Sequence, residues 1–166
     1  MAPKLEFAFT LRIGATEDNY VPLGSVKGAL QRFIANLNLG GIEGPGLKAQ
    51  IGPGSSEWFH LDPETGLGQQ STRAVMKTEE GDHICVTITG LLVVDDQLME
   101  SVKWSPNKKN TRPEDHHWII TPTFETNSEK LKWLERNHFI GQGHVVLAEV
   151  GNGQIGEYEV YKVVPV

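Results

Sequence analysis

The chain has 166 residues, of which 39% are hydrophobic and 22% charged, and its formal net charge is −6. This length can bury the core of one domain without disulfides or metals, so we expect residues 1–166 to form a single domain. The acidic balance argues against a nucleic-acid partner, which normally meets a basic face. The one cysteine, Cys85, cannot form an internal disulfide, and no apolar run is long enough for a membrane span or a signal peptide. We therefore expect a cytoplasmic protein that binds neither membranes nor nucleic acids.

The first predicted element is a strand over residues 4–14. Apolar and polar residues alternate there with a period of two, which is typical of a strand with one buried face. Residues 20–39 are ambiguous, because an apolar stripe fits a helix while alternation within the same stretch fits a bent strand. Periodicity alone slightly favours the helix. The stripe consists of Val26, Ala29, Leu30, Phe33, Ile34 and Leu37.

Residues 40–54, GGIEGPGLKAQIGPG, are rich in glycine and could be taken for a phosphate-binding loop. Such a loop leads from a strand into the N-terminus of a helix. Residues 47–51 instead alternate as a short strand. Two turns around an edge strand are therefore the favoured interpretation.

Further strands are predicted over residues 56–62, 69–78 and 83–94, with turn residues between them. The pattern is typical of an antiparallel meander. Residues 95–115 interrupt it with a long charged loop, and such loops are usually functional flaps or mobile segments. Residues 157–164 alternate again. A strong first strand and a strong last strand predict an all-β fold, a closed or nearly closed barrel in which the first and last strands pair.

Residues 116–150 stand out because they hold four of the six histidines and two of the four tryptophans. We predict two strand-like runs joined by a short helix over residues 129–136, with Asn127 or Ser128 as its cap. If the barrel contains a pocket, we expect this segment to wall it.

Metal and nucleophile chemistry find little support in the sequence. His116 and His117 are neighbours and would point to opposite faces of a strand. His138 and His144 lie about 20 Å apart on a regular strand. Cysteine clusters, HExxH and GxSxG are missing, and the glycine-rich stretches do not form a dinucleotide-binding fingerprint between a strand and a helix. Cys85 fits a small filler in a strand better than a nucleophile. We expect no metal and no cofactor, although a metal site assembled from separate strands stays open.

A set of polar and aromatic residues on the predicted strands remains as a candidate site. A closed small barrel can hold one ligand between such side chains, and a histidine or carboxylate in an apolar pocket has a pKa that suits proton transfer. Each residue could equally be a structural or outward-facing group, because alternation does not show which face is inward. The set is Trp58, His60, Arg73, His117, Glu125 and Trp133.

Four stretches together resemble the DUF3237 family, a domain of unknown function found in bacteria and fungi. The resemblance runs from Leu5 to Val164 and implies a small antiparallel barrel of lipocalin-like or allene-oxide-cyclase-like shape that is often a homo-oligomer. It implies a long bent strand, not a helix, for residues 20–39, and it brings no activity. The stretches are GGIEGPGLKAQIGPGSSEW (40–58), TRAVMKTEEGDHICVTITG (72–90), TPTFET (121–126) and WLERNHFIGQG (133–143).

The sequence departs from the family pattern at positions that bear on a pocket. A Tyr-x-Arg of the family is similar to His117 and Ile119 here, and an Asp-Trp is similar to Glu57 and Trp58. A Trp-Leu-Asn of the family corresponds to the run that starts at Trp133. We interpret the histidine and isoleucine as specialisation for a hydrophobic substrate of the kind met in secondary metabolism.

Our first hypothesis is a cofactor-independent enzyme that isomerises, cyclises or dehydrates a small apolar, aromatic or polyketide-like molecule in the barrel. The second is a non-catalytic binder or carrier, and the third is a structural or interaction protein with a filled barrel. In the first, His117 is the acid or base, Glu125 or Glu57 is its partner, and Arg73 stabilises an oxyanion. The expected substrate-binding residues are Trp58, His60, Trp118, Phe124 and Trp133.

Overall fold

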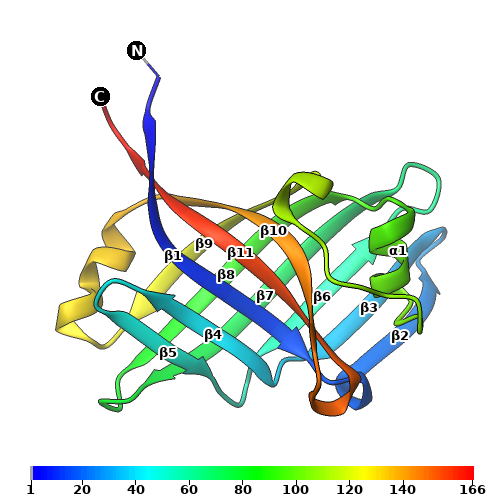
Figure 1. The fold of residues 1–166 in the computed structure, drawn as a ribbon, viewed down its shortest axis with the longest axis horizontal. Helices are drawn as coiled ribbons and strands as arrows, with labels where there is room; N and C mark the ends of the chain where they lie inside the picture. The colour runs from blue at the N-terminus through cyan, green and yellow to red at the C-terminus, as the bar shows by residue number, and fades with distance from the viewer. Residues whose placement is uncertain (1) are drawn as a thin grey trace.

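A computed structural model of the protein describes residues 2–166, and most of these residues lie in antiparallel strands (Figure 1). The elements are, in chain order, β1 (Lys4–Ala15), η1 (Glu17–Asn19), β2 (Tyr20–Val26), β3 (Leu30–Asn36), β4 (Leu39–Gly44), β5 (Leu47–Ile51), β6 (Ser56–Leu61), β7 (Leu67–Thr78), β8 (His83–Val93), α1 (Asp96–Val102), η2 (Pro113–Asp115), β9 (Trp118–Thr126), η3 (Glu129–Arg136), β10 (Phe139–Ala148), η4 (Val150–Asn152) and β11 (Gly153–Val164). The η elements are 3-10 helices.

Eight strands close into a barrel in the spatial order β7-β5-β4-β1-β11-β10-β9-β8, and the pairing of β8 with β7 completes the ring. Along the edge that faces away from β8, strand β7 has two partners. Strand β6 pairs with residues 68–73 and β5 pairs with residues 76–78. Strands β6, β3 and β2 therefore extend the barrel wall at one end. The predicted all-β barrel is confirmed, and so is the pairing of the first strand with the last, which runs out to Lys4 opposite Val164.

Alternation along the strands builds the core, as the sequence pattern predicts. On β8, Ile84, Val86 and Ile88 are buried inside the barrel, while Cys85 and Thr87 face outward. Strand β7 buries its even-numbered residues from Gly68 to Met76 in the same way. The barrel interior is thus lined by one side-chain row from each strand.

One end of the barrel is filled by aromatic rings. The ring centroid of Phe9 lies 5.6 Å from that of Phe124, 5.3 Å from that of Phe139 and 6.3 Å from that of Trp133. Helix η3 closes this end and buries Leu134 (yellow in Figure 1). The helix predicted over residues 129–136 is present, as a 3-10 helix that lies at the opposite end of the barrel from α1.

Residues 20–39 form neither a helix nor one long strand. They form the hairpin of β2 and β3, in which Val26 pairs with Leu30. Lys27 and Gly28 both have positive φ angles, 47° and 107°, which reverse the chain within three residues. The helical stripe was misleading because its positions fall on both sides of this turn. Strand β5 also differs from its expected edge position, since it pairs with β4 and β7.

Residues 95–115 are more ordered than the predicted charged loop. Asp95 begins α1 by accepting a hydrogen bond from the Leu98 backbone N–H at 2.8 Å. Leu98 is buried against the barrel, so α1 is amphipathic. The charged residues around it led to the prediction of a loop. Among residues 2–166, no helix has the length and apolar character needed to cross a bilayer.

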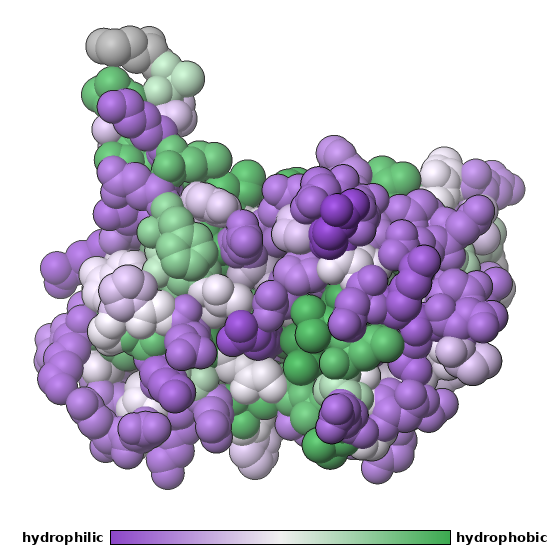
Figure 2. Space-filling model, viewed as in Figure 1, coloured by the Kyte–Doolittle hydropathy of each residue, from purple (hydrophilic) through white to green (hydrophobic). Residues whose placement is uncertain are grey.

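The outer ends of β1 and β11 form a two-stranded arm that projects beyond the barrel (Figure 1). Leu5 and Phe7 are exposed on it, and the space-filling view shows the arm standing clear of the body (Figure 2). Such exposed apolar side chains suit contact with another chain. The expected homo-oligomer stays a prediction.

Candidate active site

A cavity of about 110 Å³ lies inside the barrel at the end that β2, β3 and β6 extend, beneath α1. A closed cavity of about 150 Å³ can hold a benzene molecule. This cavity is smaller but only partly enclosed, so one small ring can lie in it and extend through its open side. Most of its wall is apolar. The apolar side chains include Ile13, Phe33, Phe59, Leu92, Leu98, Trp104, Trp118 and Val145.

A chain of hydrogen bonds crosses the polar side of this cavity. Gln70 Nε2 donates to Glu57 Oε2 at 2.8 Å and to Tyr158 Oη at 2.9 Å. Thr72 Oγ1 also donates to Glu57 Oε2, at 3.2 Å. Trp118 Nε1 donates to Gln70 Oε1 at 3.1 Å, and because an indole N–H can only donate, this contact fixes the orientation of the Gln70 amide.

Burial changes the acidity of both ionisable members of this chain. Loss of solvation raises the pKa of Glu57, and the hydrogen bonds from Thr72 and Gln70 only partly oppose that rise. Burial, and then the nearby charge of Glu57, raise the pKa of the Tyr158 phenol. The cavity therefore presents a carboxyl whose pKa lies nearer neutrality than usual and a phenol that keeps its proton.

Glu57 and Tyr158 each keep one hydrogen-bonding atom without a partner. Tyr158 Oη accepts from Gln70, and within residues 2–166 its own O–H has no acceptor. Glu57 Oε2 receives both hydrogen bonds, and no described side chain bonds Oε1. Glu57 also keeps some accessible surface, because it borders the cavity. A ligand in the cavity can therefore contact an acid–base group and a hydrogen-bond donor together.

Two glycines make room for the aromatic side chains of the site. Gly143 faces Tyr158 across the β10–β11 pair, and a Cβ there would come within 2.8 Å of both the Tyr158 and Trp118 rings. A Cβ at Gly156 would lie 2.7 Å from the Tyr158 hydroxyl oxygen. Larger residues at either position would displace the rings that carry the hydrogen-bond chain.

We predict that Gly156→Ala displaces the Tyr158 hydroxyl and lowers ligand affinity or turnover by roughly tenfold or more, because overpacking moves side chains out of position. The free energy of unfolding should fall by about 1–3 kcal/mol. Ligand titration and chemical denaturation measure the two effects. Gly46→Ala is the control for glycine replacement: it lies in the β4–β5 turn, at φ 66° with open space around it, so it can strain the turn without touching the site. Unchanged ligand binding in Gly156→Ala would contradict the assignment of Tyr158 to the site.

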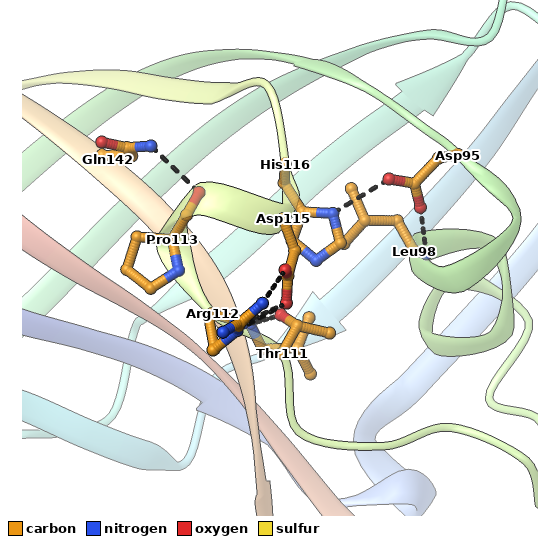
Figure 3. A network of polar contacts seen from close by, with 9 residues as sticks. Asp95, Leu98, Thr111, Arg112, Pro113, Asp115, His116 and Gln142 are labelled. Atoms are coloured by element: carbon orange, nitrogen blue, oxygen red, sulfur yellow. Dashed lines mark hydrogen bonds and ion pairs between the residues drawn. The ribbon is translucent and has the colours of Figure 1, made fainter.

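Helix α1 covers the cavity and is held at both ends. At its start, His116 Nδ1 lies 3.0 Å from Asp95 Oδ2, and Figure 3 shows the imidazole turned toward this capping carboxylate. At its end, the Tyr20 hydroxyl donates to the Val102 carbonyl, and the Tyr20 ring packs 4.6 Å from that of Trp104. These contacts fix the position of the cover over the barrel.

Of the predicted site residues, Glu57 and Trp118 line the cavity. Phe124 is buried and Trp133 is half-buried, but both pack with Phe9 in the aromatic cluster at the other end of the barrel. The expectation that residues 116–150 wall the pocket therefore holds for the start of β9 and for β10, and needs correction for η3.

The expected positions of the other candidates are corrected by the structure. His117, Glu125 and Arg73 are exposed on the outer surface, and Trp58 is 48% exposed there. His60 is half-buried beside Trp58 on the outward row of β6, because Glu57 and Phe59 take the inward row. Neighbouring residues of a strand point to opposite faces, so an inward Trp118 places His117 outside.

Sequence reasoning missed Gln70, Thr72 and Tyr158, although their positions carried a signal. Gln70 and Thr72 have the same parity on β7 as the buried Ala74 and Met76. Polar residues in an otherwise apolar inward row are buried polar groups, and buried polar groups need partners. That parity could have predicted a polar site inside the barrel.

The fold and this cavity define a class of protein: a small closed antiparallel barrel with a polar site enclosed among apolar walls. The sequence profile of the DUF3237 family, described as a protein of unknown function, matches residues 3–163, and the chain belongs to this family. A UPF0311 protein of Clostridium acetobutylicum is 23% identical over 137 residues, which cover 82% of this chain and 84% of that protein. The family resemblance noted in the sequence is confirmed.

Solved structures share the fold over nearly the whole chain. A conserved protein of unknown function from Rhodopseudomonas palustris has a TM-score of 0.74 at 20% identity, with 98% of this chain and 99% of that chain covered. A protein from Penicillium herquei, described as an enzyme, has a TM-score of 0.60 at 16% identity, with 98% and 96% covered. At these identities the likeness shows a common fold.

Proposed function

We propose that the protein is an enzyme that uses Glu57 and Tyr158 for proton transfer on a small, largely apolar molecule held in the barrel cavity. The observation that carries the proposal is the chain from Glu57 through Gln70 to Tyr158, which leaves a carboxyl oxygen and a phenol O–H free beside an apolar space. Isomerisation, cyclisation and dehydration change no oxidation state overall, and each can be promoted by one group that removes a proton and another that donates a hydrogen bond or a proton. In a dehydration the departing hydroxyl takes up a proton and leaves as water.

Each member of the site has a separate task in this scheme. Glu57, whose pKa is raised by burial, removes a proton from the ligand and returns it at another atom. Tyr158 donates its O–H to the ligand oxygen on which negative charge develops. Gln70 positions both groups, because its amide hydrogens bond to both and its oxygen is held by Trp118. The apolar wall keeps water from competing with these contacts.

The second candidate function is a non-catalytic binder with the same cavity. A binder of a purely apolar ligand has no need of a buried carboxyl, because desolvation disfavours the charged form and such a ligand offers no compensating hydrogen bond. The Penicillium herquei protein adds general support, since a barrel of this fold is there described as an enzyme. These considerations favour catalysis over carriage.

The proposal is tested by incubating the protein with the small-molecule extract of its own host and following the extract by liquid chromatography and mass spectrometry. We expect one component to be consumed and replaced by a product of equal mass or one water lighter. Native mass spectrometry of the recovered protein shows in parallel whether a component is retained. A component that is retained but never converted supports the binder, and the absence of both conversion and retention contradicts the proposal.

A further inference from the structure

Two polar atoms in the cavity wall are buried without a partner in the part of the chain that the structure describes. They are Ser101 Oγ, on the side of α1 that faces the barrel, and Gln154 Oε1, on β11. Ser101 is 6% exposed. Buried polar atoms are nearly always hydrogen-bonded, and an unmade bond is destabilising, so two such atoms in one wall indicate that something else supplies their partners.

The donor and acceptor roles of these atoms are determined by their surroundings. Gln154 Nε2 lies 2.9 Å from the Ser101 carbonyl oxygen, which can only accept, so the Gln154 amide is oriented with its nitrogen toward α1. Its oxygen therefore needs a donor. The Ser101 hydroxyl can donate or accept, because it rotates freely about its C–O bond.

The position of the two atoms relates them to the Glu57–Tyr158 pair. Gln154, Gly156 and Tyr158 occupy successive inward positions of β11, and the Tyr158 hydroxyl lies over Gly156. The step from Gly156 to Gln154 along the strand is about 6.6 Å. A molecule the size of one ring can therefore contact Tyr158 at one side and reach toward Gln154 and Ser101 at the other.

We propose that Ser101 and Gln154 form a polar subsite that binds a hydroxyl group of the ligand. A hydroxyl donates to Gln154 Oε1 and accepts from the Ser101 hydroxyl with one oxygen atom, whereas a carbonyl would leave Gln154 Oε1 unpaired. A charged group would lose its hydration among the apolar walls. The inference rests on the proposed function and narrows its substrate to a small apolar molecule, of about one ring, that carries a hydroxyl group away from the reacting atoms.

The subsite is tested with 4-fluorophenol and 4-fluorotoluene, two probes of nearly equal shape that differ in a hydroxyl and a methyl group. Titrations followed by ¹⁹F NMR give the affinity of each for the wild type and for Ser101→Ala, Gln154→Met and Glu57→Gln. Ser71→Ala, at an exposed position on β7, is the matched control for the serine replacement.

We expect the wild type to prefer 4-fluorophenol. Ser101→Ala and Gln154→Met should each reduce that preference roughly three- to tenfold, with the affinity for 4-fluorotoluene kept. Ser101→Ala should also melt no lower than the wild type, because it removes a hydroxyl that has no partner. A residue with a purely structural role would not combine weaker hydroxyl recognition with unchanged stability.

Other results would overturn the subsite. If the preference survives in Ser101→Ala and Gln154→Met but is lost in Glu57→Gln, the hydroxyl is bound by Glu57, and the proposed function stands without the subsite. If neither probe binds the wild type, or if the preference survives in all three variants, Ser101 and Gln154 do not bind the hydroxyl and the subsite is contradicted. If both subsite variants lose the preference but no component of the host extract is converted, the hydroxyl subsite is supported and the proposed enzymatic function is contradicted.

Discussion

Glu57→Gln is expected to lower the turnover of the host component by about 10²- to 10⁴-fold, the usual contribution of a general acid or base. Glutamine keeps the shape of the side chain and can still accept the hydrogen bonds of Gln70 and Thr72 through its oxygen. It cannot take up or release a proton at neutral pH. Rates measured with saturating extract component should therefore fall, while retention of that component persists.

Two variants on the outer surface serve as controls for this loss. Glu125→Gln makes the same chemical change on the exposed row of β9, and His117→Ala removes the histidine that the sequence suggested as the acid or base. Both should keep wild-type turnover within about twofold, since surface changes are usually small. Loss of turnover in His117→Ala with normal turnover in Glu57→Gln would contradict the assignment.

The same Glu57→Gln substitution should also change how stability depends on pH. Burial raises the pKa of Glu57 above its value in the unfolded chain, which is about 4.3. Between the two pKa values the folded state holds a proton that the unfolded state has released, so the free energy of unfolding of the wild type falls as pH rises through that window. Glutamine does not titrate. The melting temperature of the variant relative to the wild type should therefore increase from pH 4 upward, and a constant difference would show that Glu57 is solvated.

Phe124→Ala is expected to lower the free energy of unfolding by about 3–5 kcal/mol, as for other buried aromatic residues cut to alanine. Phe124 is 6% exposed and packs edge-on against Phe9 and Phe139 at the end of the barrel that η3 closes. Because a folded domain is stable by only about 5–15 kcal/mol, this is a large share of the total. Urea denaturation measures it directly.

The aromatic end and the cavity end should respond separately. At a temperature where Phe124→Ala is folded, its turnover should match the wild type, because Phe124 does not line the cavity. Trp58→Ala is the control for losing an aromatic side chain: Trp58 is 48% exposed and contacts Arg32 across its ring face, so the loss should stay within about 1 kcal/mol. Impaired ligand binding in Phe124→Ala at full folding would place the site nearer to η3.

Much of the barrel could be predicted because period-two alternation is a local property. The β1 and β11 patterns, each with one apolar face, were enough to predict strands and their pairing, and the turn residues between β6, β7 and β8 marked the meander. The prediction failed where one spacing of apolar residues fits both a helix and strands. The apolar stripe across the β2–β3 turn also fitted a helix. Around α1, the many charged residues indicated a loop although Leu98 is buried.

The candidate site was harder to predict because it depends on which of the two side-chain rows of each strand faces the barrel interior. Glu57 and Trp118 were identified as candidates, and both line the cavity. His117, Arg73 and Glu125 were chosen for their chemistry, but each lies one residue out of phase with the inward row. A shift of one residue moves a strand side chain from the interior to the solvent, so chemistry alone could not choose between them.

The family, most of the strands and the apolar rows that build the core could be predicted from the sequence alone, because these depend on neighbours in the chain. Which row of each strand faces inward, and which residues meet there, became known from the three-dimensional structure. Gln70 and Tyr158 are 88 positions apart, and their hydrogen bond forms because the closed ring brings β7 and β11 around the same small space. Ring closure is a global constraint, set by the number and stagger of all eight strands, and no local stretch of sequence contains it.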